Sequence, residues 1–192
     1  MRLHSLAAAA ALALSAFGSQ ATTIDFDTGT EGASVGTFYP GLSFTGAKFA
    51  SNYSLLGASE PLGIFSTSGD ASWTSANPIV IAFAGGASSF SIGVLDLGEN
   101  GFTVEAYNAS NVLIGSDTKF GPGLGEDHYD VVSVAHAGIA SVRLFQALSF
   151  SADGVILDNM NYQPVPVPEP STYALMALGL AGLGVAAGRR KA

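Results

Sequence analysis

The C-terminal end of the chain limits which residues can belong to a folded domain. A proline stands at every second position from Pro164 to Pro170. Because proline fixes φ and has no backbone N–H, we predict an extended linker at residues 164–172 that joins neither a helix nor a sheet. Residues 173–188 are apolar and uncharged, and their number is close to the minimum of about 17 that a transmembrane helix needs. A basic tail at residues 189–192 suits the cytoplasmic flank of such a helix through Arg189, Arg190 and Lys191.

This order of elements resembles a known sorting signal. Residues 167–172 contain the motif Pro168, Glu169 and Pro170, and the short apolar run and the basic end follow it. The arrangement resembles the PEP-CTERM sorting signal of Gram-negative bacteria, which is read by exosortase, a membrane-embedded protease thought to remove the tail. The resemblance implies a transient membrane anchor and delivery to the outer surface or the extracellular matrix. The alternative is an ordinary single-pass anchor behind a proline-rich stalk.

The N-terminus carries the features of a secretory signal peptide at residues 1–21. Arg2 supplies the positive charge, and residues 6–17 form an apolar stretch that is too short to be a stable transmembrane helix. Small residues stand at Ser19 and Ala21, so we predict cleavage after Ala21 and a mature chain that begins at Thr22.

The region between the two end segments has the usual size of one domain. Residues 22–163 contain 14 acids against three bases, a formal net charge of −11. Such a surface repels nucleic acid and anionic membranes, so we expect no nucleic-acid partner. The chain has no cysteine, so no disulfide supports the domain.

Short alternating runs predict an all-β domain. Phe90, Ile92 and Val94 alternate with smaller residues, and a tight hairpin at Asn100-Gly101 is expected to join this strand to the next, at 102–107. No stretch sustains a helical period. The strands predicted from such runs lie at residues 23–27, 42–49, 52–56, 79–83, 90–95, 102–107, 112–118, 129–135, 141–147 and 155–162. About ten short strands favour a two-sheet antiparallel β-sandwich.

Three short motifs extend the resemblance to the domain itself. They are Ile24-Asp25-Phe26-Asp27, residues 39–44, and residues 157–162. The domain resembles the jelly-roll domains of other exported proteins with this tail, whose fold is similar to that of carbohydrate-binding modules. The fold alone does not assign a function.

Three acidic residues are candidate ligands for a metal. Alternation places Asp158 on one face with Ile156 and Met160, where a buried carboxylate needs a partner. That partner could be Arg143, backbone N–H groups or a cation. The resemblance implies a structural Ca²⁺ near the first and last strands, for which Asp25, Asp27 and Asp158 would supply some of the six to eight oxygens.

Three further features have both a functional and a structural interpretation. Trp73 could stack on a sugar ring, although single aromatic residues of a sandwich more often pack in its core. Residues 32–36 match the G-x-S-x-G pattern around Ser34, but the sequence that follows cannot form the helix of a nucleophile elbow. His128 stands among carboxylates, which suits a solvated loop better than a metal site.

These observations favour an exported protein without catalytic activity that binds extracellular polysaccharide. The competing functions are a secreted glycosidase that uses two carboxylates, and a structural spacer at the cell surface.

Overall fold

The computed structural model describes residues 20–52, 57–123, 128–148, 154–165 and Gly179. The predicted signal peptide, transmembrane helix and basic tail lie outside these residues, except for Gln20, Ala21 and Gly179. Among the described residues, no helix is long and apolar enough to cross a membrane. The strands are β1 (Thr22–Ile24), β2 (Leu42–Thr45), β3 (Ala47–Ser51), β4 (Leu62–Ser66), β5 (Ile79–Leu95), β6 (Phe102–Tyr107), β7 (Leu113–Lys119), β8 (Tyr129–Gln146) and β9 (Ile156–Pro164).

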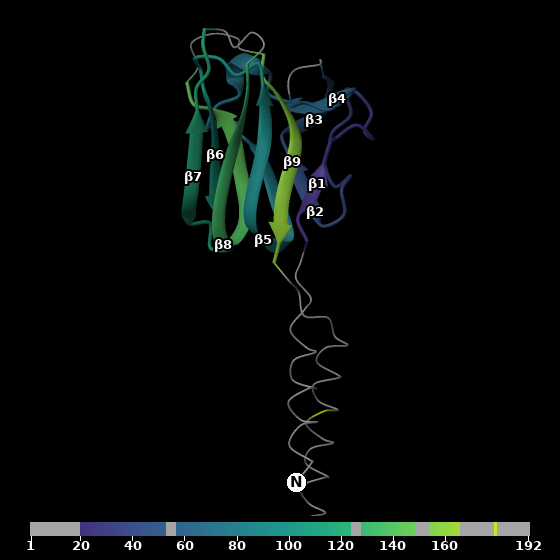
Figure 1. Cartoon of the computed structure of the whole chain (residues 1–192), viewed down its shortest axis with the longest axis vertical. Helices are drawn as coiled ribbons and strands as arrows, with labels where there is room; N and C mark the ends of the chain where they lie inside the picture. Colours follow the sequence, from purple (N-terminus) through teal and green to yellow (C-terminus); the bar gives the residue numbers. More distant parts are fainter. Residues whose placement is uncertain (1–19, 53–56, 124–127, 149–153, 166–178, 180–192) are drawn as a thin grey trace, which may run out of the picture.

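Two long strands, β5 and β8, run through both sheets of an antiparallel sandwich. They pair with each other over nearly their whole length, but their register shifts between Ala82 and Ser89. At this irregularity both strands bend back, so that the two halves of each strand lie in different sheets, as Figure 1 shows for β8. Bulges and bends of this kind let one strand pass from one sheet to the other. The predicted two-sheet antiparallel sandwich is therefore confirmed.

The pairing partners of β5 and β8 define the two sheets. In the back sheet the order is β2, the first half of β5, the second half of β8, β6 and β7. In the front sheet β9 pairs with the second half of β5, which pairs with the first half of β8. The other edge of β9 pairs with β1 and, nearer to the start of β9, with β4. Strand β4 in turn pairs with β3.

The core lies between these sheets and follows the alternation of the strands. Phe90, Ile92 and Val94 point inward from the front sheet, and Ile79 and Ile81 are buried in the back sheet. Full burial of each such side chain contributes about 1.5–3 kcal/mol of hydrophobic stabilisation. The core therefore stabilises a domain that has no disulfide.

The structure differs from the sequence prediction in several strands and in their pairing. The predicted hairpin at Asn100-Gly101 is wrong, because β6 pairs with β7 and β8 and not with β5. The predicted strand at 42–49 is two strands, since Gly46 has φ +77° and sends β3 to a different partner. Strand β4 was not predicted, and residues 129–146 form one continuous strand. Of the strand predicted at 52–56, only Asn52 is described, and it is not in a strand.

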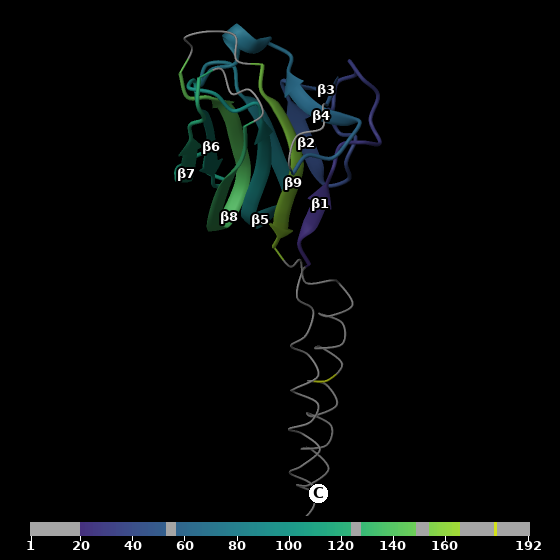
Figure 2. The ribbon, with the colours of Figure 1, turned by 45° about the horizontal axis from the view of Figure 1, so that its top comes forward.

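Both ends of the domain lie at the same end of the sandwich. Thr22 of β1 is opposite Tyr162 of β9, and Pro164 is opposite Ala87 at the turn of β5. Figures 1 and 2 show the start of β1 and the end of β9 at this same end of the sandwich. Strand β9 extends to Pro164, and the Val165 N–H donates to the Gly86 carbonyl (3.1 Å), so ordered pairing continues into the predicted linker.

Candidate functional site

A row of polar side chains crosses the outer face of the front sheet. Thr23 is opposite Asn161, Asn161 is opposite Ser91, and Ser91 is opposite Ser133. The four residues come from β1, β9, β5 and β8. Since neighbouring strands are about 4.8 Å apart, the row is about 14 Å long.

The residues of this row point outward because their sequence neighbours point into the core. Ser91 lies between buried Phe90 and Ile92, and Ser133 lies between buried Val132 and Val134. Ser89, opposite Ala135 and Gln163, begins a second row beside the first. The alternation of serine with apolar residues is visible in the sequence, but the alignment of serines on different strands depends on the register.

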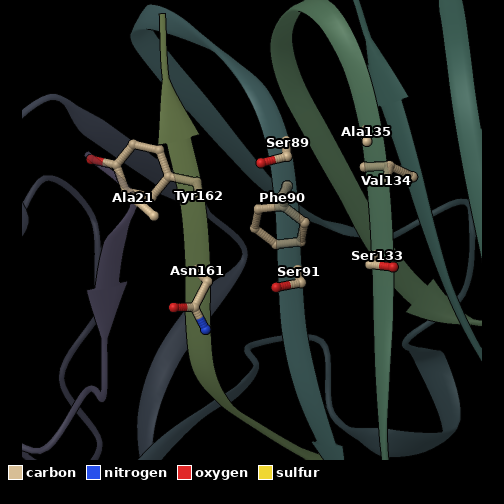
Figure 3. Close-up of a pocket in the computed structure, with 9 residues that line it drawn as sticks. All are labelled: Ala21, Ser89, Phe90, Ser91, Ser133, Val134, Ala135, Asn161 and Tyr162. Carbon is tan, nitrogen blue, oxygen red and sulfur yellow. The ribbon is translucent and has the colours of Figure 1, made fainter. Parts of the chain in front are cut away.

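A depression of about 250 Å³ lies over these two rows. Figure 3 shows Ser89, Ser91 and Ser133 along the neighbouring strands, with Asn161 and Tyr162 at one side. Its remaining lining residues are Ala21, Phe90, Val134 and Ala135, so no charged group faces the depression. We call this depression and its lining the serine face.

The serine hydroxyls of this face are available to a ligand. Among the described residues, no group forms a hydrogen bond with the hydroxyls of Ser89, Ser91 or Ser133. The side chain of Asn161 is partly engaged, since its Oδ1 accepts from Thr23 and its Nδ2 donates to the Asn159 carbonyl (3.0 Å). Each serine hydroxyl can donate one hydrogen bond and accept two, so the serine face suits a ligand rich in hydroxyl groups.

Asp158 forms a second polar cluster, which is buried. Its Oδ2 accepts from the Ser59 backbone N–H (2.6 Å) and from Asn52 Nδ2 (3.1 Å), and its Oδ1 accepts from the Asn159 backbone N–H (2.6 Å). The Ser59 hydroxyl contacts both oxygens, at 3.1 and 3.0 Å. The carboxylate therefore holds the segment around Ser59 against β9.

The face on which Asp158 lies differs from the sequence expectation. Asn159 has φ +50°, and the register shifts between the pairs Ser91–Asn161 and Gly93–Asp158. The extra residue of this bulge changes the alternation: Met160 is in the hydrophobic core, whereas Asp158, opposite Gly93, lies on the other face of β9 and is covered by the segment around Ser59. Arg143 is not its partner, because that guanidinium lies over the Tyr107 ring, 4.3 Å from its centroid, and donates to Asn111.

The surroundings of Asp158 favour its neutral form. Burial raises the pKa of the Asp158 carboxyl, the hydrogen bonds from Asn159 and Ser59 oppose this rise, and the negative charge of Asp27 adds to it. Burial is the main cause that raises the pKa of Tyr39 and Tyr129, and the negative charge of Asp158 adds to the rise in both. A buried carboxylate that accepts this many protein donors has little capacity left for a substrate or a metal.

The three predicted metal ligands have other partners. Asp27 Oδ1 accepts from the Leu62 backbone N–H (3.0 Å), and Asp25 Oδ1 accepts from the Asp27 N–H (3.3 Å). Throughout the part of the chain that the structure describes, no three His, Asp or Glu side chains form a group that could hold a metal. The Ca²⁺ site predicted at Asp25, Asp27 and Asp158 therefore stays a prediction, and the structure shows other contacts for these carboxylates.

Trp73 lies in the core, so the predicted sugar-stacking role is wrong. The side chain is fully buried, its Nε1 donates to the Leu144 carbonyl (2.8 Å), and its ring packs edge-on against Phe65 and Phe102. These contacts satisfy the polar group of a buried indole and leave no face for a ligand.

Ser34 has the loop environment expected from its sequence. It forms an isolated β-bridge with Lys48, and the next residues form turns, not a helix. It therefore lacks the setting of a nucleophile elbow. His128 precedes β8, and its backbone carbonyl accepts from the Leu97 N–H (3.0 Å), while the neighbouring Glu126 and Asp127 lie outside the described residues.

A second depression, of about 360 Å³, lies between the segment at residues 37–43 and the turn of β5. Its lining is mostly apolar and contains no acid or base. The serine face is the better candidate because its polar side chains come from adjacent strands and converge on one surface.

Comparison with known proteins assigns the C-terminal segment. Residues 166–191 match the PEP-CTERM protein-sorting motif. The chain carries a PEP-CTERM sorting signal. This signal marks an exported protein that is processed at a membrane and sorted to the cell surface. The motif residues Pro168, Glu169 and Pro170 lie outside the described part of the chain. In the sequence they follow the end of β9 at Pro164 by a few residues.

The chain also has structural neighbours of low identity. The K2 cleaved adhesin domain of Lys-gingipain gives a TM-score of 0.47 at 14% identity and covers 76% of this chain and 98% of its own. The K1 domain from Porphyromonas gingivalis W83 gives 0.46 at 13%, with 77% and 99% covered. CBM35 from Paenibacillus barcinonensis gives 0.36 at 16%, with 75% and 99% covered. No curated protein sequence matches the chain. Such similarity is too low to transfer a function.

Proposed function

We propose that this exported domain binds a neutral polysaccharide on its serine face and has no catalytic activity. The observation that carries the proposal is the alignment, on adjacent strands and next to Asn161, of serine hydroxyls that have no hydrogen-bond partner among the described residues. Hydroxyl and amide groups can hydrogen-bond to the hydroxyl groups of a sugar.

The charge distribution determines which polysaccharides are suitable. The domain carries a net charge of −11 over residues 22–163, and the lining of the serine face contains no cation. A polyanion would meet repulsion with no compensating ion pair. A neutral chain, which needs only hydrogen bonds and apolar contacts, avoids this cost.

The absence of catalysis is proposed on the position of the carboxylates. A glycosidase needs two carboxyl groups that flank a substrate bond. Neither described depression is lined by an acid, and Asp158, whose pKa is raised, is buried under Ser59. After tail removal, we expect the domain to reside in the extracellular matrix or on the outer surface of a Gram-negative cell.

The test compares two serine variants in the same binding assay. Ser91→Gln introduces a long side chain into the middle of the serine face, whereas Ser116→Gln makes the same change at an exposed position of β7. Affinity electrophoresis in gels that contain neutral polysaccharides should show retardation of the wild type and of the Ser116 variant. The Ser91 variant should bind at least about tenfold more weakly, which corresponds to about 1.4 kcal/mol.

Two results would contradict the proposal. One is the absence of retardation in every neutral polysaccharide, which would favour the structural spacer. The other is turnover on glycosidase substrates that an Asp158→Asn change abolishes, which would establish the hydrolase alternative.

A further inference from the structure

The end of the sandwich from which the sorting tail leaves is free of acidic side chains. The segments that meet there contain no Asp, Glu, Lys or Arg; they are residues 20–22, 84–88, 108–113, 136–140 and 163–165. Their common location follows from the register, because Thr22 is opposite Tyr162, Ala87 is opposite both Ile139 and Pro164, and Tyr107 is opposite both Leu113 and Ser141. We call this surface the tail end of the domain.

The opposite end of the same strands is acidic. Asp96 and Glu99 follow β5, and Asp130 is the second residue of β8. At the end of β8, Gln146 Nε2 donates to Asp70 Oδ1 (2.8 Å). Nearest to the tail end, Glu105 of β6 is directly opposite Arg143 of β8, so their charges offset each other. The negative charge of the domain is therefore concentrated away from the tail.

The tail end also exposes apolar side chains. Val112 and Leu113, at the turn between β6 and β7, are 55% and 48% exposed, and Val165 is 37% exposed. The only described cation that reaches this turn is Arg143, whose Nη2 donates to Asn111 Oδ1 (3.3 Å). An uncharged surface with exposed apolar side chains and one nearby guanidinium suits the interface of an anionic bilayer better than open water.

We propose that the tail end rests on the lipid surface while the sorting tail anchors the protein. The sorting motif begins at residue 166, one residue after Val165, so the tail end is the part of the domain that is nearest along the chain to the apolar segment. The acids at the far end are separated from it by the length of β7 and its flanking residues, about 26 Å at 3.3 Å per residue. The Debye length is about 8 Å at physiological salt. In this orientation the acids of the far end are therefore too far from the anionic lipids to be repelled strongly.

The test uses two matched cysteine positions in a chain that has no native cysteine. Val112→Cys and Phe120→Cys flank β7 at its two ends, and both wild-type side chains are 55% exposed. Each variant of the tail-bearing protein is labelled with the fluorophore NBD and reconstituted into vesicles of phosphatidylethanolamine and phosphatidylglycerol that contain lipids spin-labelled near the headgroup. Flotation with the vesicles checks that the tail is inserted.

We expect the fluorophore at position 112 to be blue-shifted and at least threefold more strongly quenched than the fluorophore at position 120. Adding Leu113→Glu to the Val112→Cys variant should reduce that quenching, while circular dichroism shows an unchanged fold. Equal quenching at the two positions, or none at either, overturns the proposal, as does failure of the tail-bearing protein to float. Quenching that requires an exosortase-type protease in the vesicles would assign the surface to that protein and also overturn it.

Discussion

Replacement of Asp158 by alanine should destabilise the domain, and we expect this loss of stability to be independent of any metal. In the Asp158→Ala variant, the backbone N–H groups of Ser59 and Asn159 lose the acceptor that each reaches at 2.6 Å. The two side-chain donors keep other partners, because Asn52 Nδ2 also donates to the Ser59 carbonyl (2.7 Å) and the Ser59 hydroxyl to the Asp25 carbonyl (3.2 Å). The cost therefore comes mainly from the two backbone groups.

The magnitude follows from these two hydrogen bonds. A hydrogen bond to a charged group contributes about 1.5–3 kcal/mol. Removal of the buried charge of Asp158 returns part of this, since a desolvated carboxylate is itself unfavourable. We expect a loss of about 3 kcal/mol in the free energy of unfolding, or about 10 °C in the melting temperature for a domain of this size. Asp158→Asn keeps one acceptor oxygen and should lose about half as much.

Urea denaturation followed by the fluorescence of Trp73 measures this effect. Trp73 is the only tryptophan of the chain and is fully buried, so its emission reports on the core. A loss below about 1 kcal/mol for Asp158→Ala would refute the assignment of a structural role to these hydrogen bonds. The same titrations with EDTA and with added Ca²⁺ should coincide. A wild type that EDTA destabilises and Ca²⁺ restores would show instead that the acids around Asp158 hold a cation.

Three further predictions concern pH, packing and processing. The raised folded-state pKa of Asp158 means that the folded protein binds this proton more tightly, so wild type should lose stability relative to Asp158→Asn as the pH rises from about 3.8 through that pKa; urea midpoints between pH 3 and 8 measure the difference. Gly93→Ala should cost about 1–3 kcal/mol in a thermal melt, because its Cβ would overlap the Tyr129 hydroxyl, and an unchanged melting temperature would contradict this packing. Mass spectrometry of the native mature protein should show an N-terminus at Thr22 and no peptide from residues 175–190, whereas an intact tail would identify a plain anchor.

The sequence predicted the elements whose signals are local. Strand β6 was predicted at its observed bounds, because the alternation of its residues is a local signal. The partners of β5 could not be predicted, since β2, β8 and β9 are distant along the chain. Asp158 was placed on the wrong face because a single bulge at Asn159 reverses the alternation, and nothing local in the sequence marks that bulge.

Neither the candidate site nor the charge distribution could be predicted from the composition, because both depend on how the strands pair. The net charge of −11 was known from the sequence, but its concentration at one end of the strands follows only from the antiparallel register. The serines of β5 and β8 likewise form one surface because Ser91 and Ser133 are paired across 42 positions of the chain. Trp73 attracted a functional interpretation because it is a single large aromatic residue, and its burial shows that residue type is a weaker guide than position in the pairing.

The position of β1 connects export to the proposed binding site. Ala21, the last residue of the predicted signal peptide, lines the serine face beside Tyr162, and Thr22 is the first residue of β1. Cleavage after Ala21 would remove one wall of this depression. The site that meets a ligand is therefore the processed one. A protein that retains residues before Thr22 should bind the same neutral polysaccharide more weakly than a protein that begins at Thr22, and equal affinities in the gel assay would show that the ligand does not reach the β1 side of the serine face.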